Sequence, residues 1–437
     1  FGVKPLFYSR GGDALFFASE IKALLELGVR PRANDGAIFE YLAYGLYDHT
    51  PETFFHGVFM LPAAHYAVCR QKSFEVKPYW DLYEAVNAEI PPADDEEAIA
   101  KLHDLIKESV RIQMRSDVPI GVTLSSGIDS STLLHFLNES LGAPAHAFSS
   151  CLEDDIYDEC QFIRKTMNPD QKRLWHTATL APNDVFSRAR ELICIEDQPY
   201  GGMQTMQYFN AYRGQGKMPV TVLLEGQGMD EILGGYKHYA ADQINNFLDS
   251  FRNLKNKAAY LSSDFAAAMT GKRNAVIRQP FADDLKNAQF IDLKYRKLPR
   301  TLRFHDHISM AFSKELRVPY LDHRLVSYCF ALPEKYKIRD GVQKYLLRTL
   351  VRERIPDAMR EKDRVEFPAF QTKWFRGVLY EPTMDIIQSS SFRARPYWDY
   401  PRLIKQVQRF FDGEGDNSFF LWQMIDLEMW LENYIDR

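Results

Sequence analysis

Short apolar runs alternate with segments of helical spacing through the middle of the chain. The strand-like runs lie at residues 120–124, 145–150, 174–177 and 219–224, and helical segments lie between them. Strands that alternate with helices in this way are typical of a parallel sheet with helices on both faces. We therefore predict an α/β fold with a doubly wound parallel sheet, whose ligands bind beyond the carboxyl ends of the strands.

The chain begins with strands rather than with a helical pattern. Residues 1–8 and 14–19 are β-rich and flank a turn signal at residues 10–13. A free-standing domain rarely opens on a strand whose partners are absent, and the first residue is Phe1 rather than Met. We therefore expect the chain to be a fragment of a longer protein.

Prolines and acidic residues divide the chain into parts. Residues 83–97 contain paired prolines and an acidic cluster, which favour a surface linker. After about residue 236 the strand signal fades and helical spacing dominates. We predict a partial antiparallel β domain at residues 1–82, a linker at 83–97, and an α/β domain with a large helical C-terminal part at 98–437.

Composition excludes several functional classes. The 437 residues carry a formal charge of −5, which gives no electrostatic reason to expect nucleic acid as a partner. No apolar run approaches the roughly 20 residues that span a bilayer. Five dispersed cysteines without a C-x-x-C pair predict reduced thiols in a cytoplasmic protein, rather than disulfides or a metal site.

The first candidate loop has the sequence LSSGIDSS at residues 124–131, between a predicted strand and a predicted helix. Its glycine lets the backbone approach a ligand closely, and the N–H groups at a helix start suit a phosphate. The serine hydroxyls add donors, and Asp129 could hold Mg²⁺. The alternative is an ordinary helix cap, because Ser and Asp are common there. The lysine of a Walker A motif is absent, which argues against a kinase-type P-loop.

The second candidate loop has the sequence EGQGMDEILGGY at residues 225–236 and also follows an apolar strand. Its glycines would let the backbone close over a nucleotide, and Asp230 supplies a second carboxylate. Two carboxylates at adjacent strand ends can hold a metal between phosphates. The alternative is a glycine-rich turn with a capping Asp. The presence of both loops in one chain argues against that alternative.

Several motifs together resemble a known family. The first loop resembles the pyrophosphate-binding loop of the N-type ATP pyrophosphatases. With the second loop, RVPYLDH at residues 317–323 and KYLLR at 344–348, it resembles the synthetase domain of glutamine-hydrolysing asparagine synthetases. Residues 1–8 and 17–23 resemble the late part of that family's N-terminal-nucleophile glutaminase domain. The motifs occur in the family's order over nearly the whole chain.

The resemblance implies an ATP-dependent amide ligase. A carboxylic acid, aspartate first, would attack the α-phosphate of ATP to form an acyl-adenylate, and ammonia would then displace AMP. The ATP contacts it implies are Ser125, Ser126, Gly127, Asp129, Ser130 and Gly226 at the phosphates, with Ser149 and Ser150 near the adenosine. It also implies that Asp129 and Asp230 share Mg²⁺ and that Lys344, Asp230 and Gln227 serve the chemistry. On sequence alone, a solvated helix lysine is the plainer interpretation of Lys344.

Three positions depart from the family pattern. Ser126 replaces a glycine, which would cost about 1 kcal/mol or more if the backbone there has positive φ. Gln227 stands where the family commonly has an acid; it can orient a substrate but cannot take a proton from ammonium. The glutaminase nucleophile is an N-terminal cysteine, so with Phe1 first we expect this chain to use ammonia and release no glutamate from glutamine.

Other interpretations remain open on the sequence alone. The acceptor could be a uronic acid or a secondary-metabolite carboxylate, as in β-lactam synthetase-like relatives, or the chain could be a non-catalytic nucleotide-binding relative. The partners we expect are the acid and ammonia or glutamine-derived ammonia, with a homodimer as the assembly to test, and neither nucleic acid nor membrane. His305 and His307, two apart on a helix, are poor metal ligands. The aromatic residues Phe419, Phe420, Trp422 and Trp430 are predicted to pack a helix.

Overall fold

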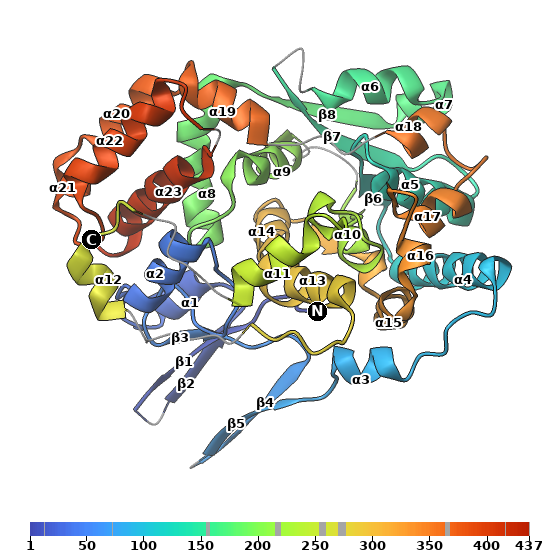
Figure 1. Cartoon of the computed structure of the whole chain (residues 1–437), viewed down its shortest axis with the longest axis horizontal. Coiled ribbons are helices and arrows are strands. Elements are labelled where there is room, and N and C mark those ends of the chain that lie inside the picture. Colours follow the sequence, from blue (N-terminus) through green and yellow to red (C-terminus); the bar gives the residue numbers. More distant parts are fainter. Residues whose placement is uncertain are drawn as a thin grey trace.

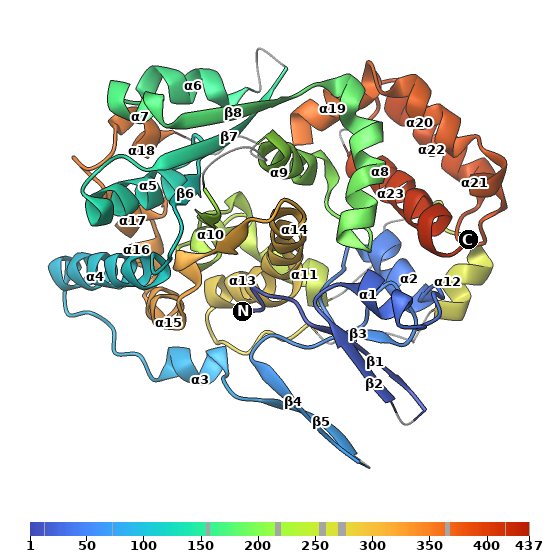
Figure 2. The same cartoon turned by 180° about the vertical axis from the view of Figure 1, so that it is seen from behind.

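The computed structural model describes residues 1–12, 14–71, 73–153, 158–214, 220–252, 259–269, 277–362, 368–415 and 417–436. Residues 13 and 219, at the ends of two predicted segments, lie outside the described residues. Figures 1 and 2 show a helix-covered sheet together with an N-terminal β part whose hairpins project from the body of the molecule.

A five-stranded parallel sheet confirms the predicted fold class. Its strand order is β10-β9-β6-β7-β8, and every pairing in it is parallel. The strands are β6 (Ile120–Thr123), β7 (His146–Leu152), β8 (Trp175–Leu180), β9 (Val222–Leu224) and β10 (Glu315–Arg317). Strand β10 was not predicted, because its three residues lie in a charged segment with no apolar run. It joins the sheet by pairing with β9, with Leu316 opposite Leu223.

The two faces of the sheet enter two separate cores. Successive side chains of a strand point to opposite faces, so Ala147 and Phe148 of β7 are buried in different clusters. Phe148 packs with residues of α8 (Val185–Glu196) and α9 (Gly202–Gly214), whereas Ala147 packs with residues of α4 (Asp95–Gln113) and α5 (Ile128–Leu141). Helices therefore cover both faces, as the doubly wound pattern requires.

The N-terminal part is antiparallel. Strands β1 (Phe7–Gly11), β2 (Ala14–Ala18) and β3 (Val58–Met60) form a sheet of order β2-β1-β3. Strands β4 (His65–Arg70) and β5 (Ser73–Pro78) form a separate hairpin that extends away from the body of the molecule (Figures 1 and 2). Helices α1 (Ile21–Glu26) and α2 (Asp35–Tyr44) complete this part.

Part of the segment predicted as a linker is helical. Helix α3 (Leu82–Asn87) buries Leu82 and Val86 against the second core, and α4 begins at Asp95. The side chain of Asp94 caps α4 by accepting from the Glu97 N–H at 2.9 Å. Paired prolines prevent a helix only over the few residues between α3 and α4.

The remaining helices form the C-terminal part and the cover of the sheet. They are α6 (Glu159–Thr166), α7 (Pro169–Arg173), α10 (Met229–Ile232), α11 (Ile244–Arg252), α12 (Ser263–Met269), α13 (Asp284–Ile291), α14 (Leu298–Ala311), α15 (His323–Ala331), α16 (Glu334–Lys337), α17 (Tyr345–Leu350), α18 (Asp357–Glu361), α19 (Pro368–Arg376), α20 (Tyr380–Ile387), α21 (Ser390–Ala394), α22 (Tyr400–Phe411) and α23 (Phe419–Tyr434). A small hairpin of β11 (Ile338–Arg339) and β12 (Val342–Gln343) precedes α17.

Helix α23 packs between the N-terminal part, through α2, and the rest of the molecule, through α8 and α9 (Figure 1). Trp422 and Trp430 are fully buried, which confirms their predicted role in helix packing. Trp430 packs edge-on against Phe55, with 5.1 Å between ring centroids. Within the described residues, no helix combines the length and the apolarity needed to cross a membrane.

Candidate active site

The first loop is held in shape by its own serines. Helix α5 begins after Gly127, and the Ser130 hydroxyl accepts from the Ser125 N–H at 3.0 Å and donates to the Ser125 carbonyl at 3.1 Å. Ser126 does not belong to the described residues with positive φ, so the strain considered from the sequence does not arise. Its N–H donates to Glu159 at 3.2 Å, and its hydroxyl accepts from Lys362 at 2.6 Å.

The second loop places its backbone against the first. A Cβ on Gly226 would lie 3.4 Å from the Asp129 backbone, so the two loops touch. Gly228 has a φ of 103°, and a side chain there would also meet Leu321 at 2.4 Å. Glycine is therefore required at this position by both backbone conformation and space.

Lys344 joins the two loops. Its Nζ lies 2.6 Å from Asp129 Oδ2 and 2.6 Å from Asp230 Oδ1, and its side chain is 9% exposed. Burial disfavours the ammonium charge, but the two carboxylates outweigh it and raise the pKa of Lys344. The residue has a left-handed backbone (φ 54°) at the start of α17, directly after the β11-β12 hairpin. Lys344 is therefore not the solvated helix lysine that the sequence alone favoured.

Both loops and Lys344 line one cavity of about 280 Å³ at the carboxyl ends of β6 and β9. The predicted site residues that line it are Ser125, Ser126, Gly127, Asp129, Ser130, Ser150, Gly226, Gln227, Asp230 and Lys344. Arg348 and Lys362 add positive charge to the same walls. Burial lowers the pKa of Lys362, and the nearby Glu159 opposes that effect. The cavity combines backbone amides, hydroxyls, cations and two carboxylates, which suits a metal-bound polyphosphate.

Ser149 and Ser150 differ in their orientation. Ser149 is buried, and its hydroxyl donates to the Leu124 carbonyl at 2.6 Å and accepts from Trp175 at 2.9 Å. It does not line the cavity, whereas Ser150 does. Adjacent strand residues point to opposite faces, so only one of the two can face the cavity.

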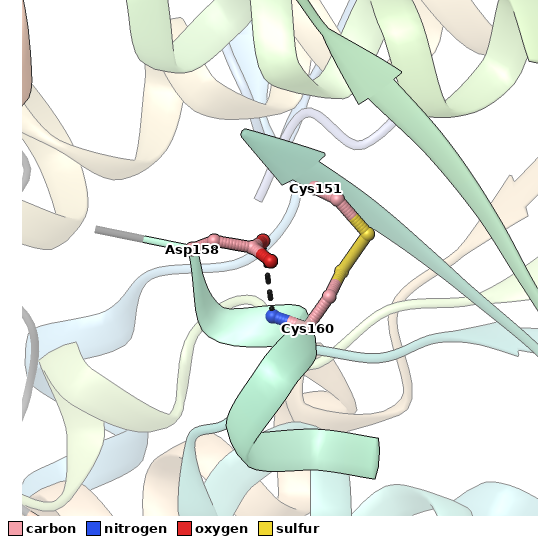
Figure 3. A group of neighbouring side chains, drawn as sticks. All are labelled: Cys151, Asp158 and Cys160. Carbon is pink, nitrogen blue, oxygen red and sulfur yellow. Dashed lines mark hydrogen bonds between the residues drawn. A yellow bond between two sulfur atoms is a disulfide. The ribbon is translucent and has the colours of Figure 1, made fainter. Parts of the chain in front are cut away.

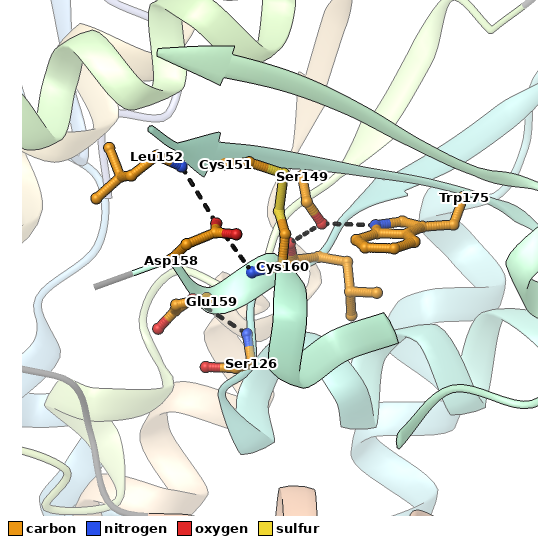
Figure 4. The surroundings of a disulfide bond; sticks show 9 residues. Ser126, Ser149, Cys151, Leu152, Asp158, Glu159, Cys160 and Trp175 are labelled. Atoms are coloured by element: carbon orange, nitrogen blue, oxygen red, sulfur yellow. Dashed lines mark hydrogen bonds between the residues drawn. A yellow bond between two sulfur atoms is a disulfide. The ribbon is translucent and has the colours of Figure 1, made fainter. Parts of the chain in front are cut away.

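A disulfide lies beside the first loop. Cys151, on β7, is bonded to Cys160, on α6 (Figure 3). Asp158 caps α6 by accepting from the Cys160 N–H at 3.1 Å, and Glu159 accepts from the Ser126 N–H (Figure 4). The bond therefore fixes the helix start that supports one side of the cavity.

The prediction of reduced thiols is wrong for this pair. Two cysteines nine residues apart carry no pairing signal in the sequence; the fold brings them together by placing α6 against β7. Asp158 lies beside the two sulfur atoms, but the disulfide removes the thiolates that a metal site would need. Cys69 and Cys194 are exposed free thiols, and Cys329 is a buried one.

A second cavity of about 520 Å³ adjoins the first. Residues shared by the two walls are Gln204, Tyr208, Gln227, Asp230 and Lys237. The Gln227 amide donates to the Tyr208 hydroxyl at 2.8 Å. Arg300 also lines the second cavity, with its guanidinium 5.2 Å from the centre of the Tyr47 ring. This cavity extends toward the N-terminal part of the chain.

Comparison with known protein families identifies the family of the chain. The family model described as asparagine synthase matches residues 101–432, which is most of the chain. The chain belongs to the asparagine synthase family. A second model, described as a glutamine amidotransferase domain, matches residues 1–80 of this family member. It is therefore an ATP-dependent carbon–nitrogen ligase of the asparagine synthetase kind.

Individual relatives agree with the family assignment. This family member is 23% identical to asparagine synthetase [glutamine-hydrolyzing] 1 of Bacillus subtilis strain 168, over 100% of the chain and 75% of that protein. It is 26% identical to asparagine synthetase [glutamine-hydrolyzing] 3 of the same strain, over 84% of the chain and 63% of that protein. It is also 24% identical to a protein named amidase chry2 from Gibberella zeae, over 92% of the chain and 71% of that protein.

Sequence reasoning missed two residues that shape the site of this family member. Lys362 holds the first loop through Ser126, and Tyr208 lies between the two cavities. Neither belongs to a recognisable motif. Gly235 did carry a signal, because it is part of a Gly-Gly pair; a Cβ there would meet Asp230 Oδ1 at 2.0 Å.

Proposed function

We propose that this family member activates a carboxylic acid with ATP as an acyl-adenylate and then converts it to the amide with ammonia. The observation that carries the proposal is the convergence of Asp129 and Lys344, in the first cavity, with Asp230, which lines both cavities. One cavity has the chemistry for a polyphosphate, and the other has room for an acid. An acid in the second cavity would approach the phosphates across the shared wall.

ATP would occupy the first cavity. The amides and hydroxyls of residues 125–127, with Ser130 and Gly226, support its phosphates, and Ser150 is the serine of β7 that faces the adenosine side. Lys344 places a positive charge beside the phosphates, where negative charge builds up as pyrophosphate leaves. Fixed charges aimed at the transition state act strongly in such a site, because they need no reorganisation. Arg348 and Lys362, which line other walls of the cavity, would stabilise the same negative charge on the phosphates.

The two carboxylates fit a divalent cation. Each lies within 2.6 Å of the same Lys344 nitrogen, so both already point toward one positive charge. Carboxylate oxygens are the ligands that Mg²⁺ prefers. We propose that Asp129 and Asp230 hold Mg²⁺, which when bound would neutralise charge on the phosphate oxygens.

The acceptor acid is proposed to be aspartate, in line with the names of the Bacillus relatives. Gln227 would orient it at the boundary of the cavities, where its amide already bonds Tyr208. A larger acid, such as a uronic acid, is the second candidate. The second cavity, at about 520 Å³, falls in the range of roughly 300–1,000 Å³ that holds drug-sized ligands. We further propose a cytoplasmic location, where ATP is supplied; the homodimer remains a prediction.

Acid-dependent release of pyrophosphate tests the proposal. Asp129→Asn and Asp230→Asn remove charge without changing side-chain size, and each should lower release by about 100-fold or more. Asp170→Asn, at a largely exposed aspartate of α7, is the matched control and should leave release unchanged. A protein that only binds nucleotide would release no acid-dependent pyrophosphate. Normal turnover by either site variant would exclude the metal role.

A panel of acids separates the two acceptor candidates. Aspartate, succinate and glucuronate are each supplied with ATP, Mg²⁺ and an ammonium salt, and both pyrophosphate and amide are measured. Aspartate should give the highest kcat/KM and form asparagine. A higher kcat/KM with glucuronate would favour the uronic acid.

A further inference from the structure

His305 is a buried histidine that opens onto the second cavity. It lies on α14, is 3% exposed, and lines the cavity together with Gln227. Its Nδ1 lies 2.7 Å from Glu225 Oε2, and Glu225 is fully buried. The other Glu225 oxygen accepts from the Tyr212 hydroxyl at 2.8 Å. Both carboxylate oxygens are therefore engaged inside the protein.

This hydrogen bond assigns the tautomer of His305. A carboxylate only accepts, so the Nδ1 atom carries the hydrogen, and in the neutral ring Nε2 therefore keeps its lone pair. No partner of Nε2 is found in the described part of the chain. The ring is also fixed by stacking on Tyr208, with 3.6 Å between ring centroids. His305 is thus an oriented base.

The stacked Tyr208 places His305 next to the boundary between the cavities. The Tyr208 hydroxyl accepts from Gln227, and both of these residues line both cavities. The acyl-adenylate of the proposed reaction forms at that boundary. Ammonia that enters through the second cavity would meet the acyl-adenylate there.

Other groups on the second cavity are less suited to accept a proton. Among its described lining residues, Asp230 is ion-paired with Lys344, and His238 bonds the buried Asp292 at 2.6 Å. The cations that face this space are Lys237, Lys297 and Arg300. On α14 itself, Asp306 pairs with Lys4, and His307 lines neither cavity. Gln227 has no basic atom.

We propose that His305 is the base of the amide-forming step and that Glu225 is its positioning residue. The proposal rests on the proposed function. Ammonia attacks the acyl carbon, a C–N bond forms, and the carbonyl electron pair moves to oxygen. The Nε2 atom of His305 takes one proton from the now positive nitrogen. The carbonyl then re-forms, the C–O bond to AMP breaks, and the imidazolium returns its proton to solvent.

The test separates the two half-reactions in His305→Gln and Glu225→Gln. Exchange of labelled pyrophosphate into ATP, with whichever of aspartate, succinate or glucuronate the panel selects, reports adenylate formation alone. In both variants the rate of this exchange should stay within about threefold of the wild-type rate. Amide formation from ammonium chloride should fall by about 100-fold or more, the usual contribution of a general base.

Hydroxylamine distinguishes a lost base from a distorted site. It is largely unprotonated at neutral pH, and its adduct releases a proton more readily than the ammonia adduct. Hydroxamate formation should therefore fall by less than about tenfold in His305→Gln. His305→Asn keeps an N–H donor toward Glu225 but has no base. If the missing base is the defect, this variant should show the same large loss of amide formation and the same smaller loss of hydroxamate formation. His307→Asn controls for the loss of a buried histidine on the same helix and should leave both half-reactions unchanged.

Two results would overturn the inference. One is ammonium-dependent amide formation at the wild-type rate in a folded His305→Gln protein. The other is an equal loss with ammonium and with hydroxylamine, which would indicate a structural role. Absence of pyrophosphate exchange in the wild type would instead refute the proposed function itself.

Discussion

Replacing Gly235 with alanine should disable adenylation by a steric route. A Cβ at this position would lie 2.0 Å from Asp230 Oδ1, 2.2 Å from Lys344 Cε and 2.9 Å from the Asp230 backbone. The φ of Gly235 is not positive, so the added methyl acts only through these contacts. Non-bonded atoms do not approach within 3 Å of a Cβ, so the ends of the Asp230 and Lys344 side chains must each move by roughly 1 Å, whereas the Asp230 backbone needs to move only slightly.

The size of the effect follows from that displacement. A misplacement of about 1 Å in a preorganised site can cost about 100-fold in rate, and the loss of one charge contact to a transition state costs about 2.7–4 kcal/mol. We therefore expect Gly235→Ala to lower acid-dependent pyrophosphate release by about 100- to 1,000-fold. The loss should fall on kcat more than on the KM for ATP, because most of the proposed phosphate contacts come from the first loop.

The assay compares Gly235→Ala with Gly11→Ala. Gly11 lies on β1, also lacks a positive φ, and a Cβ there would meet only Phe16, at 3.8 Å. Both variants are checked for folding by thermal unfolding before pyrophosphate release is measured. Release by Gly235→Ala within about threefold of the wild type would refute the reasoning, because it would mean that Lys344 need not stay between the two carboxylates.

Three further predictions follow from single contacts. Lys344→Ala should slow the pre-steady-state burst of pyrophosphate by about 100-fold while weakening ATP binding by less than about tenfold; an unchanged burst would remove Lys344 from the chemistry. Burial raises the pKa of Glu231 to about 7, so its folded form binds a proton more tightly than the unfolded chain, and stability is lost as the pH rises from the unfolded value of about 4.5 through 7. Urea unfolding should therefore find Glu231→Gln more stable than the wild type by up to about 3 kcal/mol at pH 8 and by much less at pH 5. The same difference in the free energy of unfolding at both pH values would contradict this. Replacing Cys151 and Cys160 together with serine should lower the free energy of unfolding by up to about 3 kcal/mol, as expected for a short closed loop; dithiothreitol should destabilise the wild type equally, and no effect would show that the thiols are reduced in solution.

The sequence by itself determined the α/β class and the two candidate loops. Each loop is a local unit in which an apolar strand, a few small residues and a helix start follow one another, and local propensity is enough to form it. Both loops follow strands of one parallel sheet, and the carboxyl ends of such strands share an edge. The sequence therefore places Asp129 and Asp230 at the same edge of the sheet, but only the tertiary structure sets β9 directly beside β6, because β7 and β8 lie between them in the chain.

Only the tertiary structure decided which other side chains reach that edge. Lys344 lies 215 residues from Asp129 in the chain, and no periodic pattern distinguishes it from a solvated lysine. The pairing of Cys151 with Cys160 and the inward direction of Ser150 depend on how α6 and β7 pack. The same holds for His305, whose spacing from His307 indicated only that the two do not share a metal. Periodicity reports which face of an element is buried, whereas the partner of a buried polar group is set by elements that are distant in sequence.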